Sequence, residues 1–312
     1  FSRDYGLTWS TYASYEVSPT VVVAATTSAA ATWNGVSLSM SGQYQTAVIY
    51  NGLIYTSSDY GVTWTPQTTL GVKNWRCISI SSSGQYQTAG VEPGFIWRSD
   101  NYGATWTSRA TSLTSLNWWR VSVSSTGKYQ TAVAQSYSIY RSDDYGATWN
   151  PATTPGGITT THGISVSSSG KYQSAVVWNG LIYTSSDYGV SWAQPTGPTT
   201  GNQNWYSISV SSTGQYQSAG CGGFIHRSID YGVTWNPVPA PGNRTWYSIS
   251  VSSTGQFQSA VVLGGNIWRS IDYGASWTSV TETAILNWLS ISVSSTGQYQ
   301  SATGNDGNLI YF

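Results

Sequence analysis

The chain has 312 residues, of which only 8% are charged, and its 12 basic and 12 acidic side chains give no net charge. The sequence also shows no cluster of positive charge of the kind that a nucleic-acid-binding surface needs, so we expect no nucleic-acid partner. No apolar run approaches the ~18 residues of a membrane helix, so we also expect no membrane insertion. The 17 Trp and 23 Tyr, with many Ser, Thr and Gly residues, favour strands and tight turns.

The chain opens on an eight-residue box, 2-SRDYGLTW-9, which returns six times along the sequence. Its pattern is Ser-x-Asp-x-Gly-x-Thr/Ser-Trp, and one copy has Asn in the Asp place. The residues in that place are Asp4, Asp59, Asn101, Asp144, Asp187, Asp230 and Asp272. After the first interval, the box Trp residues recur every 42 or 43 residues. A repeat of this length is typical of a propeller blade or a solenoid unit.

A second motif keeps the same period and reads 205-WYSISVSSTGQYQSA-219 in one copy. In the repeat that starts at Trp205, four short runs alternate small, polar and β-branched residues with a period of two, which predicts strands. These runs are 206-YSISVS-211, 216-YQSAG-220, 224-FIHRS-228 and 233-VTWNP-237. Four antiparallel strands in each of seven units predict an all-β fold, a seven-bladed β-propeller.

The two ends of the chain complement each other. The chain begins with a box and a fourth strand and ends with the first three strands of a unit. We therefore expect one propeller domain over residues 1–312, with the ring closed by pairing the N-terminal strand with the C-terminal three strands. The predicted blades are 288–312 plus 1–10, 33–65, 75–107, 118–150, 161–193, 205–236 and 246–278.

The box resembles the Asp-box (BNR) repeat of sialidases and related propellers, and the resemblance covers all seven units. It implies a sialidase-like or lectin-like superfamily in which the box is a folding element, between the third and fourth strands and remote from the ligand site. Residue chemistry agrees, because Asp accepts hydrogen bonds from its own turn, Gly permits positive φ, and Trp fills the space between sheets. Asn101 can still hold a turn, whereas a catalytic acid would not tolerate that change.

The boxes account for most of the carboxylates. Apart from box positions, the acids are Asp306, Glu16, Glu92 and Glu282. A glycosidase needs two carboxylates that converge on one bond, and the Arg-Ile-Pro signature that the resemblance implies for sialidases is absent. His162 and His226 have no triad companions, and no phosphate loop or metal cluster is present. We therefore expect a non-catalytic protein with no metal or cofactor, and a glycosidase is the disfavoured alternative.

The two faces of the predicted propeller differ in how much they vary. The Ser-Ser-Thr-Gly turns and the boxes both follow odd-numbered strands, so they share one nearly constant face. The loops between second and third strands and the connections between blades lie on the other face, and these vary between units. Variation on a rigid scaffold tends to mark the functional face.

A Trp opens most of the predicted first strands, at the end of the variable connections. These candidate ligand-binding residues are Trp33, Trp75, Trp118, Trp205, Trp246 and Trp288, with the preceding amides Asn74, Asn117, Asn204 and Asn287. An indole beside amides suits a sugar, which stacks its C–H face and hydrogen-bonds through its hydroxyls. The alternative is that these Trp residues pack blade against blade. Thr161 replaces Trp in one unit, which favours the functional interpretation.

Two further groups of residues have structural interpretations. An Arg precedes the box in four units, where we expect stacking or pairing on the box side, with anion binding as the alternative. These pairs are Trp97-Arg98, Tyr140-Arg141, His226-Arg227 and Trp268-Arg269. Cys77 and Cys221 lack disulfide-framework or metal spacing, and we expect them to be small buried side chains.

The sequence thus predicts a lectin-like, multivalent carbohydrate-binding propeller whose partners are glycans or glycoproteins. The alternative is a structural or adhesive module that contacts other protein subunits in a larger extracellular or virion assembly. A photosynthetic assembly factor of the same propeller type would be expected to show a basic patch, which the sequence lacks. The composition favours an extracellular or surface-exposed location; no signal peptide is present, although a mature chain would have lost one.

Overall fold

The computed structural model describes residues 32–109, 115–135, 139–156, 158, 160–196, 202–239, 241–280, 286–298, 300–304 and 310–311. Within these residues the chain forms strands and one short 3-10 turn, η1 (Thr68–Leu70), and no helix there could cross a membrane. The chain divides into two compact units. The N-terminal unit runs to Thr160 and includes Tyr188–Val190, and the C-terminal unit comprises Thr161–Asp187 and the residues from Ser191 onward.

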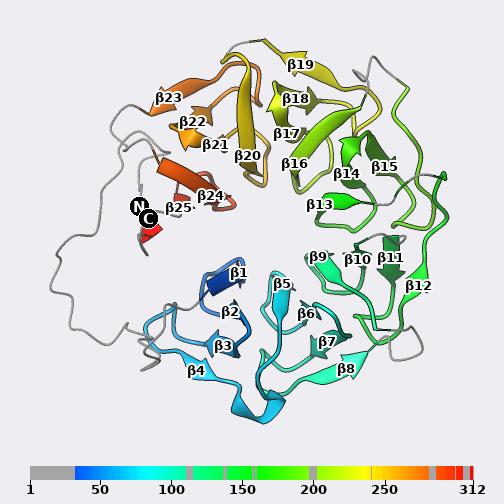
Figure 1. Cartoon of the computed structure of the whole chain (residues 1–312), viewed down its shortest axis with the longest axis vertical. Coiled ribbons are helices and arrows are strands. Elements are labelled where there is room, and N and C mark those ends of the chain that lie inside the picture. The colour runs from blue at the N-terminus through cyan, green and yellow to red at the C-terminus, as the bar shows by residue number, and fades with distance from the viewer. Residues whose placement is uncertain are drawn as a thin grey trace, which may run out of the picture. The chain divides into compact units, whose positions relative to one another are not determined.

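The N-terminal unit holds three antiparallel sheets of four strands, each in the sequence order of its strands (Figure 1). The first sheet contains β1 (Thr32–Leu38), β2 (Gln45–Tyr50), β3 (Ile54–Ser57) and β4 (Thr65–Pro66). The second contains β5 (Trp75–Ile80), β6 (Gln87–Val91), β7 (Ile96–Ser99) and β8 (Thr107–Arg109). The third contains β9 (Trp118–Val123), β10 (Gln130–Ala134), β11 (Ile139–Ser142) and β12 (Asn150–Pro151). The predicted blade of four antiparallel strands is confirmed.

The C-terminal unit repeats this arrangement, but its blades join into one 14-stranded sheet. Its first blade holds β13 (Thr161–Val166), β14 (Gln173–Gly180) and β15 (Ile182–Ser185). The next two hold β16 (Gln203–Val210), β17 (Gln217–Gly223), β18 (Ile225–Ser228) and β19 (Asn236–Val238), then β20 (Arg244–Val251), β21 (Gln258–Gly265), β22 (Ile267–Ser270) and β23 (Thr278–Val280). The last holds β24 (Leu286–Val293), β25 (Gln300–Gly304) and β26 (Ile310–Tyr311). The predicted closure strand, residues 1–10, lies outside the described residues.

Lengthened second strands join the blades of the C-terminal unit. Each of these strands runs past its own blade and pairs with the first strand of the next one. The pairs that mark these junctions are Trp178↔Asn204, Gly222↔Thr245 and Leu263↔Asn287. In the N-terminal unit the corresponding contacts are isolated bridges, Gly52↔Lys73 and Gly94↔Leu116. Backbone pairing thus supplements side-chain packing between blades.

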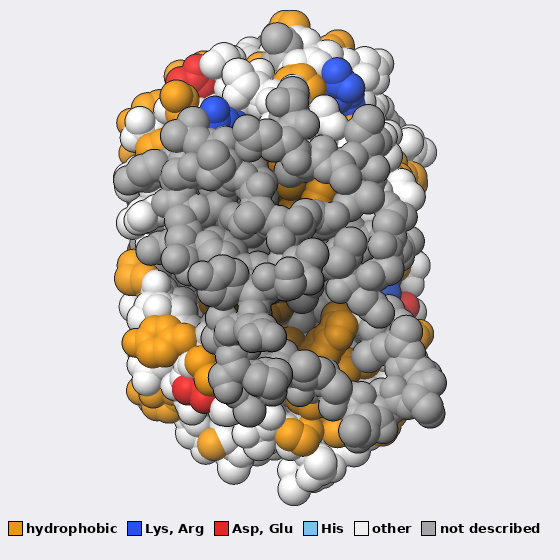
Figure 2. Space-filling view, turned by 90° about the vertical axis from the view of Figure 1, so that its left-hand side faces the viewer, with side chains coloured by type: hydrophobic (Ala, Val, Ile, Leu, Met, Phe, Trp, Pro, Cys, Tyr) orange, Lys and Arg blue, Asp and Glu red, His pale blue; other side chains and the backbone are white. Residues whose placement is uncertain are grey.

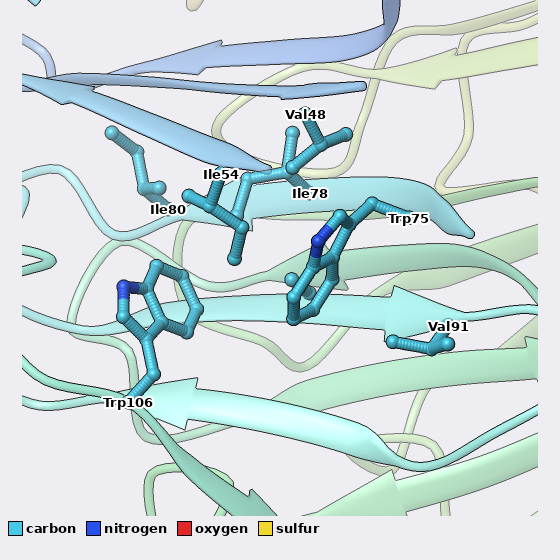
Figure 3. Close-up of a cluster of buried hydrophobic side chains, with 8 residues drawn as sticks. Val48, Ile54, Trp75, Ile78, Ile80, Val91 and Trp106 are labelled. Atoms are coloured by element: carbon cyan, nitrogen blue, oxygen red, sulfur yellow. The ribbon is translucent and has the colours of Figure 1, made fainter. Parts of the chain in front are cut away.

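The core lies between successive blades. In the N-terminal unit, Val48 and Ile54 of the first sheet pack against Trp75 and Ile78 of the second, together with the box residue Trp106 (Figure 3). Every residue of β6 is buried, because this strand has a blade on both of its faces. Burial on both faces explains why the second strands are rich in Ala and Val and lack charged residues.

A buried glutamine at the start of five of the described second strands ties neighbouring blades together. Gln87 Nε2 donates to the carbonyl of Gly84 in its own turn at 3.0 Å, and its Oε1 accepts a 2.7 Å hydrogen bond from the Thr46 hydroxyl in the preceding blade. The same pairing recurs as Thr88–Gln130, Ser174–Gln217, Ser218–Gln258 and Ser259–Gln300. A polar group buried this deeply stays stable because it has hydrogen-bond partners.

The Ser-Ser-Thr-Gly-type turns and the boxes meet on one side of each unit, which we call the Asp-box face. Tyr44 of one turn lies 4.5 Å from Tyr102 of the next box, measured between ring centroids. The equivalent pairs are Tyr86–Tyr145, Tyr129–Tyr188, Tyr172–Tyr231 and Tyr216–Tyr273. The structure thus agrees with the prediction that turns and boxes share a face. The opposite side, which carries the second-to-third-strand loops and the blade connections, is the variable-loop face.

Candidate functional site

The box acids hold turns. Asp59 Oδ1 accepts hydrogen bonds from the backbone N–H of Thr63 at 2.9 Å and from the Ser57 hydroxyl at 2.8 Å, while Thr63 Oγ1 donates to Asp59 Oδ2. Gly61, at φ +82°, donates its N–H to the Ser57 hydroxyl. These bonds, led by the one from the Thr63 side chain, lower the pKa of Asp59.

Asn101 shows that this turn does not require an acid. The N–H of Thr105 donates to Asn101 Oδ1 at 2.9 Å, as in the Asp copies, and Asn101 Nδ2 donates to the Thr105 hydroxyl at 2.8 Å. The described box residues thus hold the hydrogen-bonded turns of their own boxes. Asp4, the first of the predicted set, lies outside the described residues.

The described carboxylates form no catalytic pair. Glu92 is the single described acid outside the boxes, and its Oε2 lies 3.2 Å from Nε of Arg76. No group of three or more His, Cys, Asp or Glu side chains in the described part of the chain could hold a metal ion. Glu16, Glu282 and Asp306 lie outside the described residues. On the side drawn in Figure 2, the charged side chains that the structure describes are scattered.

The predicted ring of sugar-stacking tryptophans needs correction. Trp75, Trp118, Trp205, Trp246 and Trp288 are at most 2% exposed, so they have no free face for a sugar. Four of them donate their indole N–H to a glycine carbonyl at or just after the end of the second strand of the preceding blade. These bonds are Trp118–Gly94, Trp205–Gly180, Trp246–Gly223 and Trp288–Gly265. Blade packing, the alternative interpretation, is therefore the role of these five residues, while Trp33 is 45% exposed.

The four predicted amides behave differently from one another. Asn74 lines a pocket, and Asn117 Nδ2 donates to Gln135 Oε1 at 3.3 Å. Asn204 and Asn287 are exposed at the junctions between blades. The structure thus places the amides on the variable-loop face but does not gather them with the indoles into equivalent sites.

A β-bulge, which the sequence motif did not reveal, follows each of these first-strand openings. In β5 the pairing passes from Trp75↔Val91 to Cys77↔Gly90, so Arg76 is an extra residue outside the ladder. The same shift in the other blades sets aside Asn34, Trp119, His162, Tyr206, Tyr247 and Leu289. Bulges of this kind redirect a side chain and are frequent beside functional sites. The residue at the bulge varies between most repeats, although Tyr206 and Tyr247 are the same, and the residue after it varies as well.

In the C-terminal unit, three bulged residues and Trp178 form a continuous run of rings, the aromatic run. His162 stacks on Trp178 with centroids 5.0 Å apart, and Trp178 meets Tyr206 edge-on at 5.0 Å. Tyr206 lies 5.4 Å from Tyr247. All four side chains are half-buried, and burial, followed by the nearby Tyr247 and Cys221, raises the pKa of Tyr206. The run is a rigid, mostly apolar surface with polar ring atoms.

In the N-terminal unit the bulged residues are more polar. The Arg76 guanidinium lies over the Trp119 ring at 5.1 Å, and Asn34 Nδ2 donates to the carbonyl of Trp75 at 3.1 Å. Nearby on the variable-loop face, a pocket of about 550 Å³ is lined by Asn51, Val72, Lys73, Asn74, Val91, Pro93, Gly94, Phe95, Trp97 and Ser108. Lys73 Nζ lies 5.3 Å from the centroid of Trp97 in this pocket.

The buried cysteines and histidine serve packing. Cys77 and Cys221 are free and buried, as expected, and desolvation by burial raises their pKa to about 12 and about 11 respectively. His226 is buried against Trp205, and this burial lowers its pKa to about 4. Thiols and an imidazole in these states are poorly suited to nucleophilic or acid–base chemistry.

Comparison with known proteins gives the fold. The sequence model of the BNR-Asp box repeat matches residues 96–108. No curated protein matches the chain. Among solved structures, "YCF48 bound to D1 peptide" has a TM-score of 0.69 at 17% identity, covering 90% of this chain and 91% of that one. YCF48 from Cyanidioschyzon merolae has a TM-score of 0.68 at 18% identity, covering 90% and 95%.

A third solved structure is the β-propeller domain of Myceliophteria thermophila Cps50 (Swd1). Its TM-score is 0.68 at 11% identity, and the match covers 91% of this chain and 96% of that one. The TM-scores establish a shared architecture. Because the identities are this low, function has to be argued from the residues of the site. The repeated boxes, the four-stranded antiparallel blades and the matched structures together show that this chain is a β-propeller built from Asp-box repeats.

Proposed function

We propose that this propeller is a non-catalytic binding module that holds an extended polypeptide segment on its variable-loop face. The observation that carries this proposal is the aromatic run of His162, Trp178, Tyr206 and Tyr247, which lies on the face whose loops and connections vary between repeats. Side chains that vary on a constant scaffold point to recognition.

The physical state of the aromatic run suits a protein ligand. Its rings pack against each other and are half-buried, so they lose little conformational freedom on binding. Aromatic residues with few charges nearby are typical of the centre of protein interfaces, where Trp and Tyr act as anchors. A similar fold is known with a peptide bound, in the structure of YCF48 with D1 peptide.

The experiment is selection of twelve-residue peptides from a random display library (roughly the length that spans a few blades at ~3.3 Å per residue), followed by affinity measurement. We expect Trp178→Leu and His162→Ala to weaken the selected peptides about tenfold or more, a loss of about 1.4 kcal/mol. Tyr102→Ala is the matched control, because Tyr102 is an aromatic residue on the Asp-box face. Absence of any selected peptide, or equal losses in all three variants, contradicts the proposal.

A glycan is the second candidate ligand, and the pocket of the N-terminal unit favours it. Trp97 offers an aromatic wall, and Asn51, Asn74 and Ser108 supply amides and a hydroxyl, which is the combination that sugars require. Lys73 of this pocket is not repeated, since Leu116, Gln203 and Arg244 stand in its place in other units. We therefore propose a single glycan site here instead of seven equivalent ones.

A glycan array tests this second candidate. Binding that is lost in Asn74→Ala and Lys73→Ala but kept in Trp178→Leu supports the pocket, and no binding to any glycan excludes it.

Either ligand is compatible with a role as an adhesive or structural module of a larger assembly. We also propose an extracellular or surface-exposed location, on the basis of the low charge and the high content of Trp, Tyr, Ser and Thr.

A further inference from the structure

The arginines that precede the boxes occur in two different settings. In the N-terminal unit, Arg98 Nη2 lies 3.0 Å from Asp100 Oδ2, and Arg141 Nη1 lies 3.0 Å from Asp143 Oδ2. In the C-terminal unit, the place of those aspartates is taken by Ile229 and Ile271. Arg227 and Arg269 therefore lack the carboxylate that their counterparts bind. The N-terminal repeats thus show that an arginine at this position can pair with a carboxylate.

Arg227 and Arg269 retain unused hydrogen-bonding capacity. Nη1 of each is buried and has no hydrogen-bond partner in the described part of the chain. A buried polar group without a partner is costly, and a charged one more so. Arg227 and Arg269 are only partly buried as residues, so a carboxylate from outside can approach the accessible part of each guanidinium and balance its charge.

The neighbouring box acids do not fill this role. Asp230 accepts hydrogen bonds from the backbone N–H and hydroxyl of Thr234 and from the Ser228 hydroxyl. Asp272 is held by Ser276 and Ser270 in the same way. Both carboxylates are thus committed to their own turns.

The place that Asp100 and Asp143 fill in the N-terminal unit is open to solvent. The side chains of Asp100 and Asp143 are 54% exposed even while they bind Arg98 and Arg141. A carboxylate on another molecule can therefore reach the equivalent place beside Arg227 or Arg269. Arginine is well suited to such a contact, because its planar donors match a carboxylate.

Apolar side chains lie directly beside these arginines. Ile229 stands two residues after Arg227, just past the end of β18, in the place that Asp100 takes after Arg98 at the end of β7. Ile229 and Ile271 are 48% and 57% exposed. We call the four residues Arg227, Ile229, Arg269 and Ile271 the Arg–Ile patch.

The surroundings of the patch favour a negatively charged partner. Lys171 lies over the Tyr172 ring at 5.2 Å, and the Tyr172 ring lies 4.5 Å from that of Tyr231, in the same box as Ile229. Between residues 203 and 280 the acids are the two box aspartates, against three arginines. The patch thus combines unpaired positive charge with exposed aliphatic surface.

We propose that the Arg–Ile patch docks a partner polypeptide in which acidic side chains stand next to apolar ones. The acid pairs with Arg227 or Arg269 as Asp100 and Asp143 pair with their own arginines, and the apolar neighbour covers the isoleucine. Two adjacent blades present the same pair of residues, so a partner with two such acid–apolar pairs gains from both contacts. The patch lies on the Asp-box face, so this docking is separate from binding at the variable-loop face.

The test uses a fluorescein-labelled synthetic peptide with two Asp-Leu pairs joined by a flexible Gly-Ser linker of about ten residues. Its reference is the same peptide with Asn in place of Asp. Two double variants remove the site: Arg227→Gln with Arg269→Gln, and Ile229→Asp with Ile271→Asp, which supplies the missing internal carboxylates. Arg98→Gln with Arg141→Gln is the matched control, because those arginines are already paired.

We expect the acidic peptide to bind the unmodified protein and to lose affinity about tenfold or more in both site variants. The control should change affinity less than about twofold, and the Asn peptide should not bind. The Ile→Asp variant adds ion pairs, so its melting temperature should be unchanged or higher, and its loss of binding is then not due to unfolding. This expectation is independent of whether the variable-loop face binds its own ligand.

Several results would overturn the proposal. The first is that the acidic peptide does not bind at concentrations up to about 1 mM. Another is an equal loss in the control variant, which would indicate general electrostatic attraction. Binding of heparin or inorganic phosphate at Arg227 and Arg269 without peptide binding would replace the acidic polypeptide with a simple polyanion or anion.

Discussion

The Thr46 hydroxyl donates a hydrogen bond to Gln87 Oε1 across the boundary between two blades, over a distance of 2.7 Å. The other end of the same amide donates to the Gly84 carbonyl. One buried side chain therefore joins the second strand of one blade to the first turn of the next. This contact explains why the repeat requires Gln at a position surrounded by apolar residues.

Replacing this amide should destabilise the fold. Gln87→Leu leaves a buried hydroxyl and a buried carbonyl without partners, and each such group costs about 1–3 kcal/mol. We expect the free energy of unfolding to fall by about 2–4 kcal/mol, measured by urea denaturation. Adding Thr46→Val should restore about 1 kcal/mol, because it removes one of the unpaired groups.

Gln85 provides the control for that experiment. It lies two residues earlier in the same turn, and its side chain is partly exposed. Gln85→Leu should leave the unfolding midpoint nearly unchanged. Equal effects of the two Leu substitutions would show that the amide contacts of Gln87 do not stabilise the protein.

The Asp box should tolerate an amide but not a methyl group. Asp144→Asn can reproduce the bonds that Asn101 makes, so we expect a change within about 0.5 kcal/mol. Asp144→Ala leaves the N–H and hydroxyl of Thr148 without their acceptor, and should cost about 1–2 kcal/mol. Thermal unfolding of the two variants distinguishes these outcomes, and similar losses in both would contradict the assigned role.

The same acid gives a pH dependence with a defined sign. Burial raises the pKa of Asp144, but hydrogen bonds from Thr148 and Ser142 outweigh this effect, so its pKa is lowered overall. Asp144 therefore stabilises the fold above the unfolded pKa of about 3.9, and this contribution disappears as the pH falls through the lower folded pKa. Asp144→Asn should lack this acid-side contribution when unfolding is measured as a function of pH.

His226 should make the protein sensitive to mildly acidic conditions. Burial lowers its pKa to about 4 from 6.5, so the unfolded chain binds a proton in this interval while the folded chain does not. Stability should therefore fall as the pH decreases from about 6.5 to about 4, by up to about 3 kcal/mol. Tyr140 and Tyr183 occupy the same place in other blades, so His226→Tyr should fold and flatten this part of the pH profile. An unchanged profile in the variant would refute the assignment.

The two thiols should be inert in the folded protein. Because burial raises the pKa of Cys77 to about 12 and that of Cys221 to about 11, the reactive thiolate is scarce at pH 8. We expect no rapid reaction with a thiol reagent such as Ellman's reagent, and release of two equivalents after denaturation. Fast labelling of the native protein would show that one of these sites opens.

The sequence predicted the features that arise from local chemistry. Asp59 and Thr63 belong to one turn, so their spacing alone indicates a hydrogen-bonded reversal. The repeat length indicated the number of strands in each blade. Tyr60 was less obvious, since it adopts φ +63° next to Gly61 at +82°, and such a conformation in a residue other than glycine cannot be read from composition.

Features that depend on contacts between blades could not be predicted in the same way. The Trp residues that open the first strands were expected to bind sugar, but Trp246 is buried against the preceding blade, a contact about twenty residues away in sequence. The bulge at Tyr206 depends on the register between β16 and β17, which the strand pattern does not reveal. The signal that was present was variation, because this residue and the one after it differ between most repeats, while the opening Trp and the later strand residues largely agree.

The bulged residue has a consequence for how such a protein can change. Because it stands outside the hydrogen-bonded ladder, one side chain can replace another there without altering the pairing of the strands that flank it. The present chain already demonstrates this freedom with Arg76, Trp119, His162, Tyr206 and Tyr247. Duplication of a blade therefore does not fix which residue stands at its bulge. Protein engineers can substitute these bulged residues to change recognition while the strand pairing is kept.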